Sequence, residues 1–231
     1  MPEPLSQDIY TRLKAMTVGF DIRPGARLNE VALARDLGVS RTPLRESLNR
    51  LVAERLIDFK PGTGFICREL DPQAIYDLYE LRCALECAAV RLACMRASDD
   101  ALAAINADLH ATGLNADGLT IAQATERDEA FHIAIARATG NAALVADLER
   151  INDRIRFIRW INMAARITAS KAEHLAIANA LLARDADRAE QVLRAHITQR
   201  MDQVVDAVKE GLSSIYMPGA KDFFSRIIKE A

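Results

Sequence analysis

The sequence predicts a mostly α-helical protein, in which a small N-terminal unit with two short strands precedes an all-α antiparallel helical bundle. Three observations predict this fold class. Glycine and proline are sparse in the 231-residue chain, at 10 and 7, and alanine and leucine are plentiful, which favours helices. Apolar residues recur at helical spacing along most of the chain. Strand-forming residues make two short runs between positions 56 and 67, around a turn that contains glycine.

The chain begins with short amphipathic helices. Residues 6–16 predict the first of them, and Arg23-Pro24-Gly25 predicts a turn after it. Asn29 is placed to cap a second short helix, and Gly38 stands where that helix should end. The two helices therefore follow one another closely.

A third helix starts at Ser40, which is expected to cap it, and Pro43 falls in its first turn, where a missing N–H is harmless. Two strands, 56–59 and 64–67, follow and are joined by residues 60–63. Helices followed by a strand pair are typical of a winged helix-turn-helix, which we expect to occupy residues 1–70. The buried stripe of the third helix is predicted to be Leu44, Leu48 and Leu51.

The polar side of this third helix is suited to duplex DNA. Arg41 and Arg45 lie one turn apart and can donate to phosphates or to the guanine edge in the major groove. Thr42 is short enough to reach a phosphate or a thymine methyl, and Asn49 is on the same side of the helix. An arginine pair on a helix can also be a merely solvated face. Here the cap, the leucine stripe and the strand pair in order favour DNA binding.

The turn between the strands is expected to contact DNA as well. Lys60 brings a positive charge, while Gly62 and Gly64 let the backbone approach the duplex closely. The first 69 residues carry 11 Lys and Arg against 9 Asp and Glu, and the whole chain has a net charge of −2. DNA binding must therefore depend on where individual arginines stand and not on a strongly basic domain.

Residues 19–68 resemble the N-terminal DNA-binding domain of the GntR family of bacterial transcription regulators. The resemblance is carried by Arg23-Pro24-Gly25, by the run from Leu37 to Glu46 and by Gly62–Phe65. It implies that Arg41 and Arg45 touch operator DNA. Some members carry a further arginine on the second helix, where this chain has Val31.

Long helices are expected after residue 71, in a domain that spans 71–212, and a tail covers 213–231. Breaks are expected at Ser98-Asp99, near Gly118, at Gly140-Asn141, near Ala165 and at Arg184-Asp185. These breaks define six predicted helices, 73–96, 99–114, 120–138, 142–163, 168–184 and 186–210.

Four polar residues lie on otherwise apolar faces of these helices. Asp128 and His132 are separated by one turn, and His174 and His196 follow on later helices. Each histidine alone is explained by a hydrogen bond in the core. Burial of such groups without partners costs about 1–3 kcal/mol each. One divalent metal can satisfy all four, with zinc expected first and nickel or manganese as alternatives.

Residues 73–210 resemble the FCD effector-binding domain of the FadR-like branch of the GntR family, and the count of six helices indicates its VanR-like type. In such domains an aspartate and three histidines hold a metal. The resemblance therefore implies that the metal ligands here are Asp128, His132, His174 and His196. A small organic acid could then bind at the metal, with Arg82 clamping its carboxylate. A structural ion pair between Arg82 and Glu86 is the alternative role.

The function expected from these features is that of a ligand-responsive transcription regulator, by default a repressor. It would bind a palindromic operator as a homodimer, because one short helix reads too few base pairs. No catalytic residue is expected, although a metal-dependent hydrolase or a DNA-binding protein with a purely structural bundle are alternatives. The absence of a long apolar run or signal segment indicates a cytoplasmic protein without membrane attachment.

Overall fold

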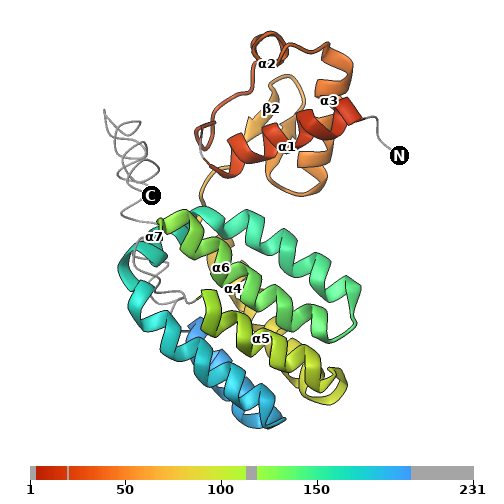
Figure 1. The fold of residues 1–231 in the computed structure, drawn as a ribbon. Coiled ribbons are helices and arrows are strands. Elements are labelled where there is room, and N and C mark those ends of the chain that lie inside the picture. The colour runs from red at the N-terminus through yellow and green to blue at the C-terminus, as the bar shows by residue number, and fades with distance from the viewer. Residues whose placement is uncertain (1–3, 20, 113–118, 199–231) are drawn as a thin grey trace. The chain divides into compact units, whose positions relative to one another are not determined.

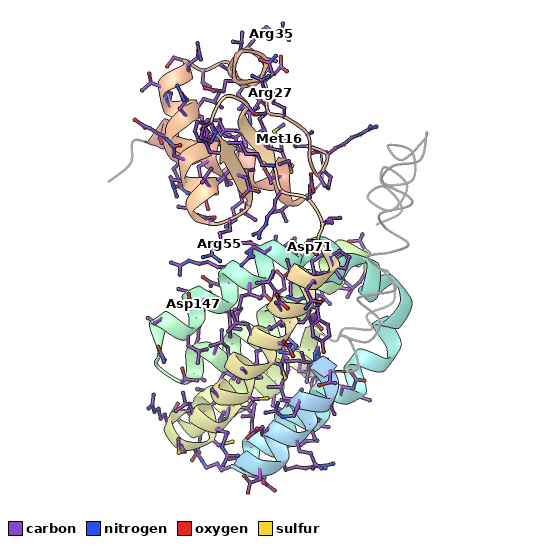
Figure 2. All side chains as sticks on the ribbon, turned by 180° about the vertical axis from the view of Figure 1, so that it is seen from behind. Met16, Arg27, Arg35, Arg55, Asp71 and Asp147 are labelled. Atoms are coloured by element: carbon purple, nitrogen blue, oxygen red, sulfur yellow. The ribbon has the colours of Figure 1, made fainter. Side chains whose placement is uncertain are left out.

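The structure is a computed structural model that describes residues 4–19, 21–112 and 119–198 (Figure 1). The chain divides into two compact units, Met1–Asp71 and Pro72–Ala231. Side chains fill the interior of each unit (Figure 2). The expected tail 213–231, and the part of the last predicted helix beyond residue 198, lie outside the described residues.

The described residues of the first unit form three helices, as the sequence predicts. They are α1 (Pro4–Val18), α2 (Glu30–Leu37) and α3 (Arg41–Ala53), and α3 packs against both of the others. The predicted leucine stripe of α3 is completely buried and forms the centre of the core together with Ile9 and Leu13 of α1. Burial of side chains of this size stabilises the unit by about 1.5–3 kcal/mol each.

The ends of α2 are fixed by the residues that the sequence indicates. The side-chain oxygen of Asn29 accepts hydrogen bonds from the backbone N–H groups of Val31 and Ala32, at 3.0 and 3.1 Å. Gly38 ends the helix with φ 69°, in the left-handed region that suits glycine. Ser40 stands at the N-cap of α3, but within the described residues its side chain makes no cap hydrogen bond, so that part of the prediction is wrong.

The predicted wing is a small antiparallel sheet. Strands β1 (Ile57–Lys60) and β2 (Gly64–Cys67) pair from Ile57 with Cys67 to Lys60 with Gly64. In the turn between them, Thr63 N–H donates to the carbonyl of Lys60 at 3.0 Å, and Gly62 has φ 80°. Pro61 followed by glycine at positive φ is the sequence that a type II turn prefers.

The second unit is an antiparallel helical bundle (Figure 1). Thr120 begins α6 with a capping box, in which the Thr120 hydroxyl accepts from the N–H of Gln123 and the Gln123 side chain accepts from the N–H of Thr120. Helices α4, α6 and α7 pack on one another and α5 packs on α6 and α7. The bounds are α4 Pro72–Arg96, α5 Asp99–Thr112, α6 Ile121–Ala138 and α7 Ala142–Leu182, with a further helix over 186–198.

The predicted break near Ala165 is wrong. Residues 142–163 and 168–184, expected as two helices, belong to the single 41-residue helix α7. Its sequence contains neither glycine nor proline, so nothing in it ends the hydrogen-bonded ladder. The helix changes direction along its course (Figure 1), and it reaches both sides of the bundle core without a loop. In the described part of the chain, no helix is long and apolar enough to span a membrane.

Candidate nucleic-acid interface and metal centre

Helix α3 presents its arginines to solvent. The side chains of Arg41 and Arg45 are 61% and 50% exposed, and Thr42 and Asn49 are exposed too. The same helix buries its leucines on the opposite side, so the amphipathic pattern fixes which side faces outward. The predicted DNA-reading residues of α3 are therefore accessible to a duplex.

A carboxylate lies between the two arginines. Oε2 of Glu30, the first residue of α2, lies 3.3 Å from Nε of Arg45 and 3.8 Å from Nη2 of Arg41. Glu30 is only 19% exposed, so its contact is shielded more than an ordinary surface ion pair. The sequence analysis did not single out Glu30, because it belongs to a different helix from its partners.

Helix α3, the recognition helix, and the wing line the same cavity. A cavity of about 480 Å³ is lined by Arg41 of α3, Glu30 of α2, and Thr63 and Gly64 of the wing. Arg27 also lines it and forms an isolated antiparallel β-bridge with Ile66 of β2. Lys60 and Gly62 are exposed at the wing but do not line this hollow.

Other polar residues of α3 have a structural role. Arg50 lies with its guanidinium 3.7 Å from the ring centre of Tyr10, whose hydroxyl donates to Glu54 at 2.7 Å. The buried hydroxyl of Ser47 donates to the carbonyls of Pro43, at 3.0 Å, and Ser6, at 3.3 Å. These contacts tie the recognition helix to α1 and fix the direction in which it points.

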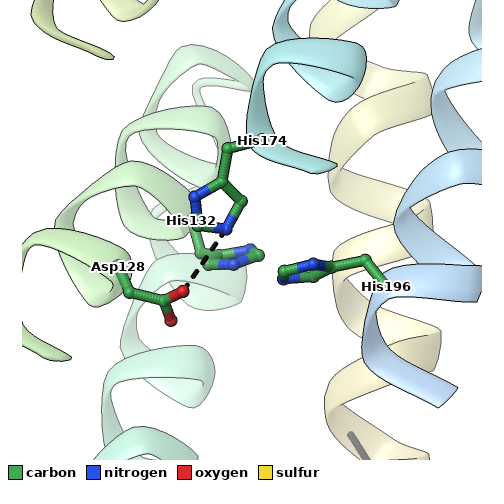
Figure 3. A group of neighbouring side chains, drawn as sticks. All are labelled: Asp128, His132, His174 and His196. Atoms are coloured by element: carbon green, nitrogen blue, oxygen red, sulfur yellow. Dashed lines mark ion pairs between the residues drawn. The ribbon is translucent and has the colours of Figure 1, made fainter. Parts of the chain in front are cut away.

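The second unit brings the predicted metal ligands together. Asp128 and His132 come from α6, His174 from α7, and His196 from the helix 186–198; all four are buried and point toward one another (Figure 3). One ligand atom from each residue lies within 4.8 Å of all the others. A zinc ion holds its ligands at about 2.1 Å, which separates ligand atoms by about 3–4 Å, so the cluster matches a metal site after a small adjustment. His110, which the sequence analysis left out, is exposed on α5.

Two further carboxylates orient the histidine rings. Oε2 of the buried Glu86 lies 2.5 Å from Nδ1 of His132, and Oε2 of Glu173 lies 2.7 Å from Nδ1 of His196. Carboxylates on the second ring nitrogen leave Nε2 as the ligand atom and make it more basic. Nε2 of His132 has no hydrogen-bond partner among the described residues, as expected of a ligand atom.

Asp128 is fixed on its other side by an arginine. Its Oδ1 lies 3.3 Å from Nε2 of His174, and its Oδ2 pairs with Nη2 of Arg159. Arg159 is 1% exposed and also donates to Oδ1 of Asn152 at 2.8 Å. Arg159 is not among the predicted site residues. Its position seven residues after Asn152, beside Ile155 and Ile158 on a buried stripe, is the signal that indicates its burial.

Arg82 makes the ion pair with Glu86 that was one of its two expected roles. Its guanidinium is 0% exposed, and Nε pairs with Oε1 of Glu86 at 2.5 Å. Its two terminal nitrogens have no hydrogen-bond partner within the described part of the chain. A buried guanidinium with unsatisfied donors is costly unless an acceptor binds there.

The buried charges around the cluster act on one another. Burial opposes the ionised form of Glu86, but Arg82 and His132 outweigh burial and hold the pKa of this carboxyl far below its usual range. Burial lowers the pKa of His132, against the opposing effect of Glu86, and so favours the neutral ring that binds a metal. Burial also lowers the pKa of Arg159, and the charge of Arg82 lowers it further. Arg82 and Arg159 thus bring two like charges to this site.

The chain matches two family models in the same order as its two units. Residues 5–66 match "Bacterial regulatory proteins, gntR family", and residues 77–199 match the FCD domain. A crystal structure of a transcriptional regulator GntR from Rhodococcus sp. RHA1 has the same fold, with a TM-score of 0.65 and 21% identity over 87% of this chain and 98% of that one.

Curated relatives extend over nearly the whole chain. The "Nta operon transcriptional regulator" of Aminobacter aminovorans is 38% identical over 87% of this chain and 95% of its own length. The "HTH-type transcriptional repressor GlaR" of Escherichia coli K12 is 29% identical over 83% of this chain and 92% of its own. The chain therefore belongs to the GntR family of bacterial regulatory proteins, carries an FCD domain, and is a ligand-responsive transcription regulator and not an enzyme.

Proposed function

We propose that the protein binds a palindromic operator as a homodimer. Helix α3 enters the major groove with Arg41, Thr42, Arg45 and Asn49, and the wing contacts the DNA backbone beside it. The exposed arginines beside a shared hollow support this arrangement, since the hollow joins the recognition helix to the wing. At the wing, the contacting residues are Lys60, Gly62 and Gly64. A regulator with a chromosomal operator works in the cytoplasm.

The FCD domain is proposed to hold one divalent metal ion at Asp128, His132, His174 and His196. Three nitrogen ligands and one carboxylate favour zinc, while nickel or manganese are the alternatives. When bound, the metal supplies a Lewis-acidic position that an anionic ligand can occupy. The observation that carries this proposal is the convergence of four buried ligand atoms from three helices, within 4.8 Å.

The effector is proposed to be a small organic acid. Arg82 and Arg159 are both fully buried beside the cluster, and the terminal nitrogens of Arg82 find no acceptor among the described residues. A carboxylate matches the fork of a guanidinium and would satisfy these donors with two parallel hydrogen bonds. An anion also relieves the repulsion between the two arginines.

Effector binding is proposed to shift the helices of the bundle between two packings. Arg82 belongs to α4 and Arg159 to α7, so a ligand that pairs with both changes how these helices pack. In a dimer this shift alters the spacing of the two recognition helices and releases the operator. The protein then acts as a repressor that the organic acid inactivates.

A mobility-shift titration tests the sensing claim. Mono- and dicarboxylates, sugar acids and amino acids are added to the operator complex of the wild type, Arg82→Gln and Arg82→Lys. We expect one class of acid to release the operator from the wild-type protein. Both variants should need an acid concentration at least about tenfold higher for the same release. Arg150→Gln, at an exposed arginine of α7, is the matched control. Sensing at Arg82 is excluded if no acid changes wild-type binding, or if all variants respond alike.

Metal analysis separates this proposal from a purely structural bundle. Protein purified without a histidine tag is dialysed against zinc or nickel and measured for bound metal. About one equivalent per chain is expected, whereas less than about half an equivalent favours a bundle whose histidines serve only packing.

A further inference from the structure

One face of α4 is left apolar and uncovered. Leu81 is 50% exposed and Met95 69% exposed, the two most exposed large apolar side chains described in the second unit. Ala84 and Ala88 stand exposed between them. The opposite side of α4 carries Arg82 and Glu86 into the core, so the exposed face is not free to turn inward.

The spacing of these residues is that of a helix-packing seam. Leu81, Ala84, Ala88 and Met95 follow one another at intervals of three, four and seven residues, which keeps them on one side of the helix. Alanines in the middle allow two helix backbones to approach closely, while the larger side chains interlock toward the ends. Arg91, which falls in this stripe, turns aside to Asp187 and Glu190 at 2.8 and 2.9 Å.

The stripe is complementary to itself when reversed about Ala88. Leu81 and Met95 are each seven residues from Ala88, on opposite sides, and Ala84 and Leu92 are each four residues away. We propose that α4 packs antiparallel against α4 of a second copy, with the two-fold axis passing Ala88. A two-fold interface requires this kind of self-complementarity, in which each residue meets the residue at the mirrored position.

The charges at the ends of the stripe agree with this pairing. Glu80 and Arg96 lie eight residues before and after Ala88, about 12 Å from the axis along the helix. Both are exposed, and neither forms an ion pair within the described residues. An antiparallel partner places Arg96 of one copy near Glu80 of the other, twice in each dimer. A parallel partner would place like charges together.

This surface deepens the homodimer of the proposed function, on which it rests. The proposed dimer then forms through α4 alone, in a single antiparallel register. It also places the contact on the helix that carries Arg82, one residue from Leu81. A change at the effector site can therefore reach the partner through the same helix.

Charge reversal tests the register by sedimentation of the full chain. Glu80→Arg and Arg96→Glu should each weaken dimerisation by about three- to tenfold, because like charges then face each other. The double variant should restore the wild-type dissociation constant. If the wild type is a monomer, the homodimer itself is wrong; if it is a dimer and the double variant is as weak as the single ones, this register is wrong.

Two further variants test the face and its centre. Leu81→Asp should raise the dissociation constant by about tenfold or more, while Leu182→Asp, at an exposed leucine of α7 (41%), should leave it unchanged. Ala88→Cys should cross-link to itself under mild oxidation, and Ala84→Cys should not, since its mirrored copy lies about 12 Å away along the helix. If the dimer survives Leu81→Asp, or if both cysteine variants cross-link equally, α4 is not the dimer interface. The copies then meet through another face, or residues 199–231 cover the apolar face of α4.

Discussion

At the scale of single residues, three carboxylates each lie between two basic groups. Glu30 contacts Arg41 and Arg45, Glu86 contacts Arg82 and His132, and Asp128 contacts Arg159 and His174. For the buried carboxylates Glu86 and Asp128, moving a partner away leaves a charge unpaired in the core. Glu30 and Glu86 thus support residues that are proposed to bind DNA, effector or metal, whereas Asp128 is itself a proposed metal ligand.

Glu30→Ala is expected to reduce the discrimination of the operator from random DNA by about tenfold. Without the carboxylate, Arg41 and Arg45 lose their fixed direction, and the removal of a negative charge beside the duplex strengthens non-specific binding. Competition between operator and random duplexes at several salt concentrations measures the ratio.

Asp36→Ala is the matched control for Glu30→Ala. Asp36 is also an acidic residue of α2, but it pairs with Arg35 and not with the recognition helix. It should change non-specific binding alone. An unaltered specificity ratio in Glu30→Ala contradicts a positioning role for this carboxylate.

His174→Ala is expected to lower metal affinity by at least about tenfold. The substitution removes one of the four proposed metal ligands and leaves Asp128 with one partner fewer. Metal content after dialysis against a graded chelator gives the affinity. His110→Ala, at an exposed histidine, should bind metal as the wild type does. Equal metal content in His174→Ala and wild type would show that the metal, if present, binds elsewhere.

The sequence was sufficient to predict the four residues that cluster in the bundle, but not the residues around them. Asp128 and His132 are separated by one helical turn, so their common face can be read from spacing alone. Glu86 and Glu173 support histidines on other helices, and no local pattern reports a contact between separate elements. Arg159 was missed because a guanidinium is expected in water unless a partner such as Asp128 is already known.

At the scale of elements, local rules work where a specific residue ends or starts the helix. Asn29 and Gly38 delimit α2 and the predicted turn between β1 and β2 is present, since each position requires a particular side chain or backbone angle. The break near Ala165 failed for the opposite reason. A weak apolar pattern alone does not end a helix that contains no glycine or proline.

Ala165→Pro tests the continuity of α7. In an uninterrupted helix, proline removes a hydrogen bond and clashes with the preceding turn, so the free energy of unfolding should fall by about 3 kcal/mol or more. Ala165→Gly should cost about 1 kcal/mol at the same site. Denaturant unfolding, followed by circular dichroism, measures both. A proline variant as stable as the wild type would restore the predicted loop.

At the scale of the whole molecule, DNA recognition and the response to a ligand belong to different units. The first unit carries exposed arginines at a shared hollow, and the second carries buried arginines around a ligand cluster. The order of the units and their fold class could be predicted from sequence, because each has its own hydrophobic pattern. The proposed homodimer involves a second copy, so contacts within one chain do not report its geometry.

Selection of binding sites from random duplex DNA, by the wild type and by Arg41→Ala/Arg45→Ala, tests the central claim most directly. Arg12→Ala, an exposed arginine of α1, is the control. The wild type and the control should enrich an inverted repeat with half-sites about one helical turn apart. The double variant, still folded by circular dichroism, should enrich no sequence. Enrichment of the same repeat by the double variant would contradict the account, as would a wild type that enriches none.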